Sequence, residues 1–284
     1  MGRYLWFENL GYLSILLKIW KTSGLFFLIS GTTFFIFTYI NILIAQKLSP
    51  PSELRYLFEY INKNVWDISD ENLWEIPNVN LFSKGINKII FYSILVLSFF
   101  VGIASIKNWQ TFLLYFYSTP FNIKDSVFNK DIGFYIFNLP FLQYIYAWCL
   151  GLLTFTFIVS LTIYLLYGKI RVNISGQRNF FFIDNAPKIH LLILLSLVLF
   201  VFSFKYLIGQ YNLLYSQRGV VFGTCYTDIY AVLPLYKIMF WICIICGILF
   251  LLNIFVKTFK FIFVLIIAFF ISLLRVILII LKLL

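Results

Sequence analysis

Long apolar stretches separated by short charged segments run through most of the chain. The uncharged runs that are long enough to cross a bilayer cover residues 22–46, 89–106, 142–167, 189–208 and 238–256, followed by a sixth at about 261–281 that contains Arg275. A helix needs ~20 apolar residues to cross ~30 Å of hydrocarbon. The strict alternation typical of a membrane barrel does not occur in these runs. The pattern therefore predicts an all-α, polytopic transmembrane helical bundle of about six spans, in a single domain over residues 1–284.

The connections between these runs differ in character. Segment 47–88 is polar, with prolines and acidic residues, and predicts a loop with one or two short surface helices. Segment 107–140 opens with the apolar stretch 109–117, which is too short to cross a bilayer and predicts an interfacial or re-entrant helix. Segment 205–237 contains a polar run from Tyr211 to Asp228.

Composition strengthens the membrane prediction. Hydrophobic residues make up 62% of the chain and charged residues only 12%, against about 45–50% and 25% in soluble domains. The net charge of +11 comes from basic residues that flank apolar runs, which suits anionic lipid headgroups as partners and not nucleic acid. Both sides of the bundle would carry 11 Lys and Arg, so the positive-inside rule leaves the orientation open.

The apolar runs offer little chemistry. They contain no Asp or Glu, and a titrating carboxylate is what proton-coupled transporters keep at membrane depth. Cys243 and Cys246 form a C-x-x-C pair inside an apolar run, where thiols pack as small hydrophobic groups. His190, the only histidine, starts the fourth run and is interpreted as an interfacial residue. We expect no catalytic residue, no metal and no cofactor.

Four charged residues in the loops are the candidates for partner or ligand contacts: Asp125, Asp131, Arg218 and Asp228. Carboxylates beside aromatic residues can bind a cation or act as acid and base. Loop-tethering ion pairs and helix caps are the commoner roles. Hydroxyl residues in the spans, such as Thr33 and Thr156, favour close helix packing over a polar pore lining.

Three segments resemble a known family. They are residues 6–12 (WFENLGY), residues 119–142 from Thr-Pro-Phe to DIGFYIFNLPFL, and residues 211–234 from YNLLYSQRGVVFG to Leu-Pro. Together they resemble uncharacterised protein family 0182, large integral membrane proteins of bacteria and cyanobacteria without an established activity. The resemblance implies a truncated form that lacks a first span and a C-terminal extracytoplasmic domain. It also implies that loops 107–140 and 205–237 are extracytoplasmic. Tyr230 stands where the family often has histidine, which weakens a metal or acid–base role for that loop.

These observations lead to three functional hypotheses. The first is a non-enzymatic membrane subunit or scaffold that docks a protein partner through the aromatic loops 107–140 and 205–237, with Arg218 as the strongest contact. The second is a transporter or channel for a solute or lipid, with Thr33 and Thr156 on its path. The third is a lipid-modifying enzyme that uses Asp125, Asp131 or Asp228. The expected location is the plasma (inner) membrane of a bacterium or cyanobacterium, or the corresponding organelle membrane.

Overall fold

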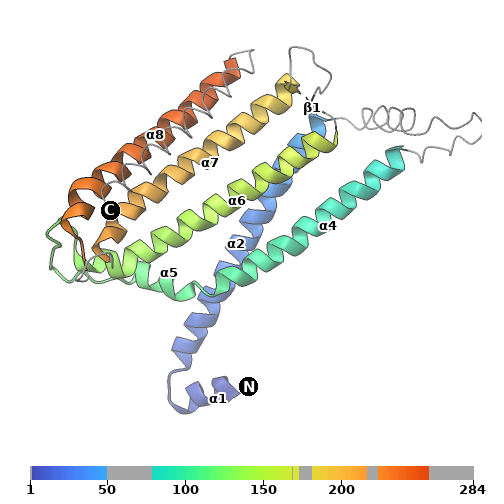
Figure 1. The fold of residues 1–284 in the computed structure, drawn as a ribbon. Coiled ribbons are helices and arrows are strands. Elements are labelled where there is room, and N and C mark those ends of the chain that lie inside the picture. The colour runs from blue at the N-terminus through green and yellow to red at the C-terminus, as the bar shows by residue number, and fades with distance from the viewer. Residues whose placement is uncertain (1, 50–78, 168, 173–180, 216–222, 256–284) are drawn as a thin grey trace, which may run out of the picture. The chain divides into compact units, whose positions relative to one another are not determined.

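The computed structural model describes residues 2–49, 79–167, 169–172, 181–215 and 223–255. The α-helices are α1 (Gly2–Asn9), α2 (Leu13–Lys47), α4 (Val79–Ile106), α5 (Trp109–Phe116), α6 (Leu139–Leu166), α7 (Asn185–Asn212) and α8 (Leu233–Leu252) (Figure 1). Two short antiparallel strands, β1 (Ile170–Val172) and β2 (Phe181–Ile183), connect α6 to α7 and pair Ile170 with Ile183.

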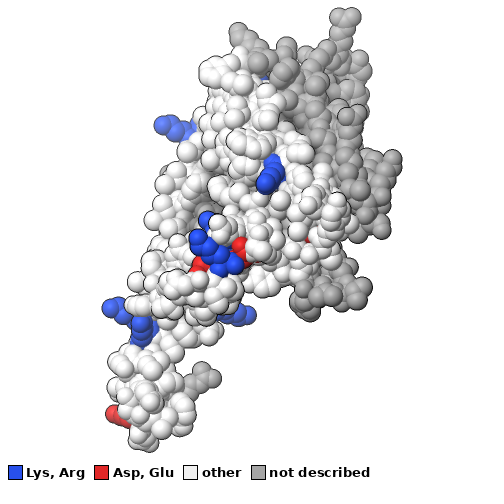
Figure 2. Space-filling model, turned by 90° about the vertical axis from the view of Figure 1, so that its left-hand side faces the viewer, with Lys and Arg blue, Asp and Glu red and all other residues white. Residues whose placement is uncertain are grey.

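Five of the described helical segments are long and apolar enough to cross a membrane. They are Leu13–Lys47, Lys88–Ile106, Phe134–Leu166, Asn185–Tyr215 and Asp228–Phe255. Each contains or closely overlaps one predicted run, and the all-α helical bundle is confirmed. On the face drawn in Figure 2, charged side chains are few: several Lys or Arg side chains gather beside Asp or Glu near the middle, and most of the described surface is uncharged.

Two other predictions have different outcomes. The sixth run at 261–281 and most of segment 47–88 lie outside the described residues. The short helix predicted from Trp109 is α5, while its interfacial or re-entrant position stays a prediction.

The chain divides into two compact units, Met1–Ile40 with Lys84–Tyr144 and Asn41–Ser83 with Ile145–Leu284.

In the first unit, α2 and α4 approach closely at two glycines. A Cβ atom added to Gly31 would lie 3.1 Å from the carbonyl oxygen of Ser98, and one added to Gly102 would lie 2.8 Å from the Phe27 ring. Small residues at such positions let two helix backbones come together, and dispersion contacts then supply much of the association energy in lipid. The T-shaped contact between the Phe27 and Phe99 rings, 5.5 Å apart, extends the same interface.

In the second unit, α7 and α8 pack as antiparallel neighbours. Gly209 lies against the Tyr236 ring, and Gly247 lies against the Phe200 ring. Further along the pair, Leu192 of α7 and Phe250 of α8 form a buried cluster. From one contact to the next, the residue comes earlier in α7 and later in α8, so the two helices run in opposite directions.

Two helices begin with a π-helical turn directly before a Leu-Pro pair. The turn η1 (Phe134–Asn138) leads into α6, and η3 (Asp228–Val232) leads into α8. In each, the leucine N–H donates to the carbonyl five residues earlier, Leu139 to Phe134 and Leu233 to Asp228. A proline in a regular helix loses a hydrogen bond and clashes with the carbonyl four residues back. The wider turn before Pro140 and Pro234 relieves that conflict.

Candidate functional site

The loop between α5 and η1, residues 117–133, is folded as a compact hairpin. The Asp125 N–H donates to the Lys130 carbonyl (2.8 Å), and the Ile132 N–H donates to the Ile123 carbonyl (3.0 Å). Asn122 and Asn129 adopt left-handed backbone conformations, with φ of 59° and 53°, which asparagine tolerates better than most residues. The loop therefore has a defined shape set by its own backbone.

Asp131 holds the base of this loop. Its Oδ1 accepts hydrogen bonds from the N–H groups of Gly133 (2.7 Å) and Phe121 (3.1 Å), and its Oδ2 accepts one from Asn122 (2.7 Å). The N–H groups of Gly133 and Phe121 lower the pKa of this carboxyl below its ordinary value of 3.8, because they stabilise the charged form. A Cβ atom on Gly133 would lie 2.9 Å from Asp131 Oδ1 and 3.3 Å from the Thr119 carbonyl oxygen, so a larger residue there would displace the carboxylate.

Asp125 organises the tip of the loop in the same way. Its Oδ1 accepts from the Val127 N–H (3.0 Å), and its Oδ2 accepts from the Phe128 N–H (2.6 Å) and the Tyr135 hydroxyl (3.1 Å). Both loop carboxylates thus accept hydrogen bonds from loop N–H groups and the Tyr135 hydroxyl, a structural role that differs from the ion pairs and helix caps named in the sequence analysis.

The depressed pKa of Asp131 predicts that the loop loosens in acid. Since the folded pKa lies below the unfolded value, the stabilisation is present at neutral pH and is lost as the pH falls through the folded pKa. Hydrogen-exchange protection of the Phe121, Asn122 and Gly133 amides should hold down to about pH 4 and fall below it. Asp131→Asn keeps one acceptor oxygen at every pH but puts an NH2 where the second oxygen accepts from a backbone N–H, so its protection should be lower throughout and independent of pH in this range. Protection that falls equally in the variant would contradict the prediction.

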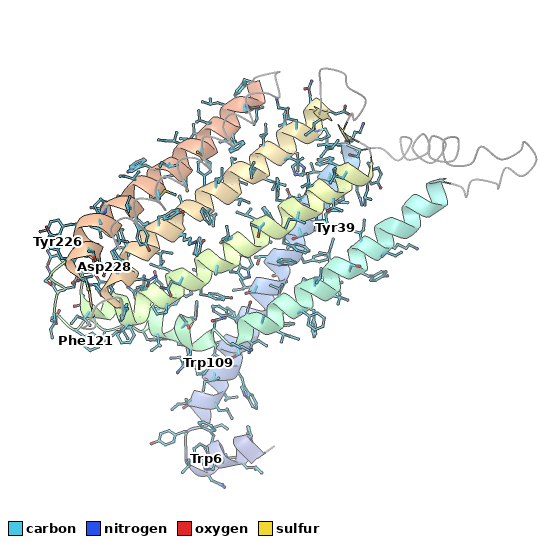
Figure 3. The ribbon with its side chains drawn as sticks, in the orientation of Figure 1. Trp6, Tyr39, Trp109, Phe121, Tyr226 and Asp228 are labelled. Carbon is cyan, nitrogen blue, oxygen red and sulfur yellow. The ribbon has the colours of Figure 1, made fainter. Side chains whose placement is uncertain are left out.

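Aromatic side chains cover the surface around the loop, and we call Phe116, Tyr117, Phe121 and Phe137 the aromatic surface. The Phe121 ring stacks on the Phe137 ring, with centroids 5.9 Å apart and planes at 11°. Phe116 and Tyr117 are 61% and 67% exposed, and Phe121 is 49% exposed. Figure 3 shows Phe121 on the loop near the start of α6. Asp131 fixes the backbone of Phe121, while Phe116 and Tyr117 are carried by the end of α5 and Phe137 by η1.

The two remaining candidate residues belong to the second loop. Asp228 starts η3 and is 1% exposed, and its Oδ2 accepts from the Cys225 N–H (3.1 Å). It therefore closes the turn that precedes α8 (Figure 3). Tyr226 and Tyr230 beside it are strongly exposed, and their rings lie 4.3 Å apart. Arg218 lies outside the described residues.

The structure also contains a buried polar chain that the sequence analysis did not foresee. His190 is 8% exposed and contacts side chains of two other helices. Its Nε2 lies 3.1 Å from Asn41 Oδ1, and its Nδ1 lies 2.7 Å from the hydroxyl of Tyr164. With the Asn41 amide in this orientation, Oδ1 can only accept, so Nε2–H donates to it. Nδ1 of the neutral imidazole then accepts a hydrogen bond from the Tyr164 hydroxyl. His190 is therefore a buried connector between helices.

An ion pair closes the connection next to this chain. The Lys169 Nζ lies 3.0 Å from Asp184 Oδ2, on either side of the β1–β2 pair, and the Lys169 side chain is 9% exposed. The Asp184 N–H also donates to the Lys169 carbonyl (3.4 Å). The end of the second unit that carries His190 is thus rich in buried polar groups.

Metal ligands do not cluster anywhere in the part of the chain that the structure describes. Cys243 and Cys246 are both buried free thiols, which agrees with the packing role expected for the C-x-x-C pair.

Comparison with known proteins gives the family. The profile of the Uncharacterised protein family (UPF0182) matches residues 1–284. A UPF0182 protein of Clostridium tetani is 33% identical over 263 residues, which cover 90% of this chain and 26% of the relative. A UPF0182 protein of Clostridium novyi is 34% identical over 81% of this chain and 24% of the relative. One from Thermobifida fusca is 37% identical over 57% of this chain and 15% of the relative.

The chain thus spans about a quarter or less of the length of these curated relatives. No solved structure matches it. The match over its full length and the motifs at 119–142 and 211–234 agree, and the chain belongs to the UPF0182 family.

Proposed function

We propose that this chain is a non-enzymatic membrane subunit that docks a protein partner through the aromatic surface. The observation that carries the proposal is the use of Asp125 and Asp131 as acceptors of backbone N–H groups in the loop that presents the exposed Phe121, whose own N–H is bonded to Asp131. Rigid exposed aromatic rings are the side chains that dominate binding energy at interfaces, because they lose little conformational entropy.

The partner that we propose is a polypeptide that covers the exposed rings of the aromatic surface. The docking surface of the partner should be apolar and should carry hydrogen-bond acceptors opposite Lys124 and Lys130. The carboxylates next to these lysines, Asp125 and Asp131, are already bonded to backbone N–H groups. The membrane that we propose is the plasma (inner) membrane.

Photo-crosslinking in native membranes tests the docking proposal directly. A benzophenone amino acid is placed at Tyr117 or Phe121, and at Phe100 of α4 as the control. Phe100 is 61% exposed on a membrane-spanning helix, so it should react with lipid alone. We expect polypeptide adducts, identified by mass spectrometry, at positions 117 and 121. Lipid adducts alone at all three positions would reject the docking surface.

Substitution measures how much the aromatic surface contributes. We expect Phe121→Ala to weaken the partner complex by about tenfold or more, as a central aromatic contact does. The fraction of crosslinked partner against partner concentration gives the change in affinity. Phe100→Ala, a truncation of the same size on a lipid-facing position, should leave the affinity unchanged. Equal effects of the two variants would count against a specific contact at Phe121.

The hydroxyl groups of the spans give less support to a transport path. Thr33 Oγ1 donates to the Ile29 carbonyl (2.5 Å), and Thr156 Oγ1 donates to the Leu152 carbonyl (2.8 Å). A hydroxyl that is bonded to its own helix has less capacity left to replace the hydration of a passing solute. Catalysis by the loop carboxylates is also the weaker proposal, because Asp125 and Asp131 each accept three hydrogen bonds from the loop and the Tyr135 side chain.

A further inference from the structure

His190 can form both of its hydrogen bonds only while its imidazole is neutral. Nε2–H donates to Asn41 Oδ1 at 3.1 Å, and Nδ1 accepts from the Tyr164 hydroxyl at 2.7 Å. A neutral imidazole offers one donor and one acceptor, whereas the imidazolium ion has two donors and no acceptor. The neutral ring therefore matches both partners, and the protonated ring conflicts with Tyr164.

Protonation of His190 would leave the hydrogen of the Tyr164 hydroxyl without an acceptor. Nδ1–H would donate to the phenol oxygen, and the hydroxyl hydrogen would have to turn away from the ring. Tyr164 is 0% exposed, so no solvent can accept this hydrogen. Among the described residues, His190 is the hydrogen-bond partner of the hydroxyl. A buried donor that loses its acceptor keeps the full cost of its desolvation, so this arrangement of the three side chains resists the proton.

The charged groups near His190 oppose a further positive charge. Lys188 lies two residues before His190 on α7 and is 7% exposed. Lys169 is 8% exposed, and its N–H donates to the Tyr164 carbonyl (3.0 Å). Asp184 is the described carboxylate at this end of the unit, and its Oδ2 is bonded to Lys169 Nζ at 3.0 Å. Two lysines and one carboxylate make this a poor place for an imidazolium ion, because like charges disfavour it.

The helices around His190 supply no negative charge. α2, α6, α7 and α8 contain no Asp or Glu. The other titratable groups near this level of the second unit are Tyr39 and Lys47 of α2, Tyr167 directly after α6, and Cys246 of α8. Near neutral pH, tyrosine and cysteine are uncharged and lysine is a cation. None of these described groups can therefore offer an ion pair to a protonated His190.

We propose that His190 is a pH-sensitive connection that holds α2 against α6 and α7 while its imidazole is neutral and releases α2 when it is protonated. The segment released is the part of α2 in the second unit, residues 41–47. An exposed histidine has a pKa of about 6.5, so the open form takes up the proton more readily than the closed one. The equilibrium constant for opening therefore rises as the pH falls below about 6.5, by up to about tenfold per pH unit.

Thermal unfolding in a mild detergent tests the pH dependence. Between about pH 7.5 and 5.5 the Tm of the unaltered protein should fall by roughly 3–5 °C. Histidine is the only side-chain type whose ordinary pKa lies in this range, and the chain contains a single histidine. The matched variant is His190→Gln, because glutamine has a donor and an acceptor at every pH, and its Tm should stay level over the range. A Tm that falls equally in both proteins, or in neither, would overturn the proposal.

Solid-state NMR in lipid bilayers gives an independent answer without a variant at His190. Histidine labelled with ¹⁵N gives the signal of one residue, and tyrosine is labelled with ¹³C at the ring carbon that carries the hydroxyl. At about pH 7.5 we expect the Nε2–H tautomer and a close ¹⁵N–¹³C contact, which Tyr164→Phe should abolish. As the pH falls to about 5.5, the imidazolium signal should appear and should lack this contact. An imidazolium ion that keeps the contact, or an Nδ1–H tautomer at neutral pH, would contradict the pH-sensitive connection.

Discussion

His190→Leu is expected to lower the free energy of unfolding of the second unit by about 3 kcal/mol. The imidazole bonds Tyr164 and Asn41, at 2.7 Å and 3.1 Å, inside a part of the molecule that excludes solvent. Leucine removes both bonds and leaves the fully buried Tyr164 hydroxyl without its acceptor. Since Asn41 belongs to α2, Tyr164 to α6 and His190 to α7, the substitution loosens three helices at once.

Thermal unfolding in a mild detergent, followed by near-UV circular dichroism, measures this effect. Tyr164→Phe removes a single bond and should cost less, about 1 kcal/mol. The double variant should lose less stability than the sum of the two single losses, because both changes break the same contact between Tyr164 and His190. Ser203→Ala is the control on α7, since that buried hydroxyl donates to its own Phe200 carbonyl. A His190→Leu protein as stable as the control would contradict the connecting role.

Gly102→Val is expected to destabilise the first unit by about 2 kcal/mol through overpacking. The added atoms meet the Phe27 ring at 2.8 Å and the Phe27 carbonyl oxygen at 3.0 Å. The ring can turn aside, but the carbonyl belongs to the backbone of α2. The helices must therefore separate and lose the close contact that small residues allow.

Alanine makes the test of this interface sharper, because it should act with opposite signs at two glycines. At Gly24 of α2 a Cβ atom meets nothing within 4 Å, so Gly24→Ala should stabilise the helix by about 0.5–1 kcal/mol. Gly102→Ala should destabilise it, because the contact outweighs the gain in helix propensity. Thermal unfolding of both variants decides the matter, and stabilisation by both would mean that α2 and α4 are not closely packed at Gly102.

The sequence was informative about the helices because membrane spans need only length and low charge. It located the body of each described membrane-spanning helix but not α1 and not the helix ends, since Lys18 and Lys21 are compatible with helix and α2 begins at Leu13. The carboxylates were harder to interpret. The role of Asp131 depends on N–H groups up to ten residues away in a folded loop, and no spacing rule predicts that geometry.

His190 shows why the buried polar chain escaped prediction. Its partners lie 26 and 149 residues away in the chain, and hydropathy gives no information on which spans are neighbours. A weaker signal was present. Asn41 and Tyr164 lie near the ends of two runs, and His190 lies near the start of the following one. With alternating spans, all three fall near the same membrane surface.

The π-helical turns before Pro140 and Pro234 have a geometric consequence. A π turn contains one residue more than a regular turn of helix, and each residue of an α-helix corresponds to a rotation of about 100° around its axis. The extra residue in η1 therefore determines on which side of the helix axis the chain enters α6 from the 117–133 loop. A single deletion within Phe134–Asn138 would act as a rotation, turning Phe121 and its neighbours to another side of the helix without changing any of their side chains.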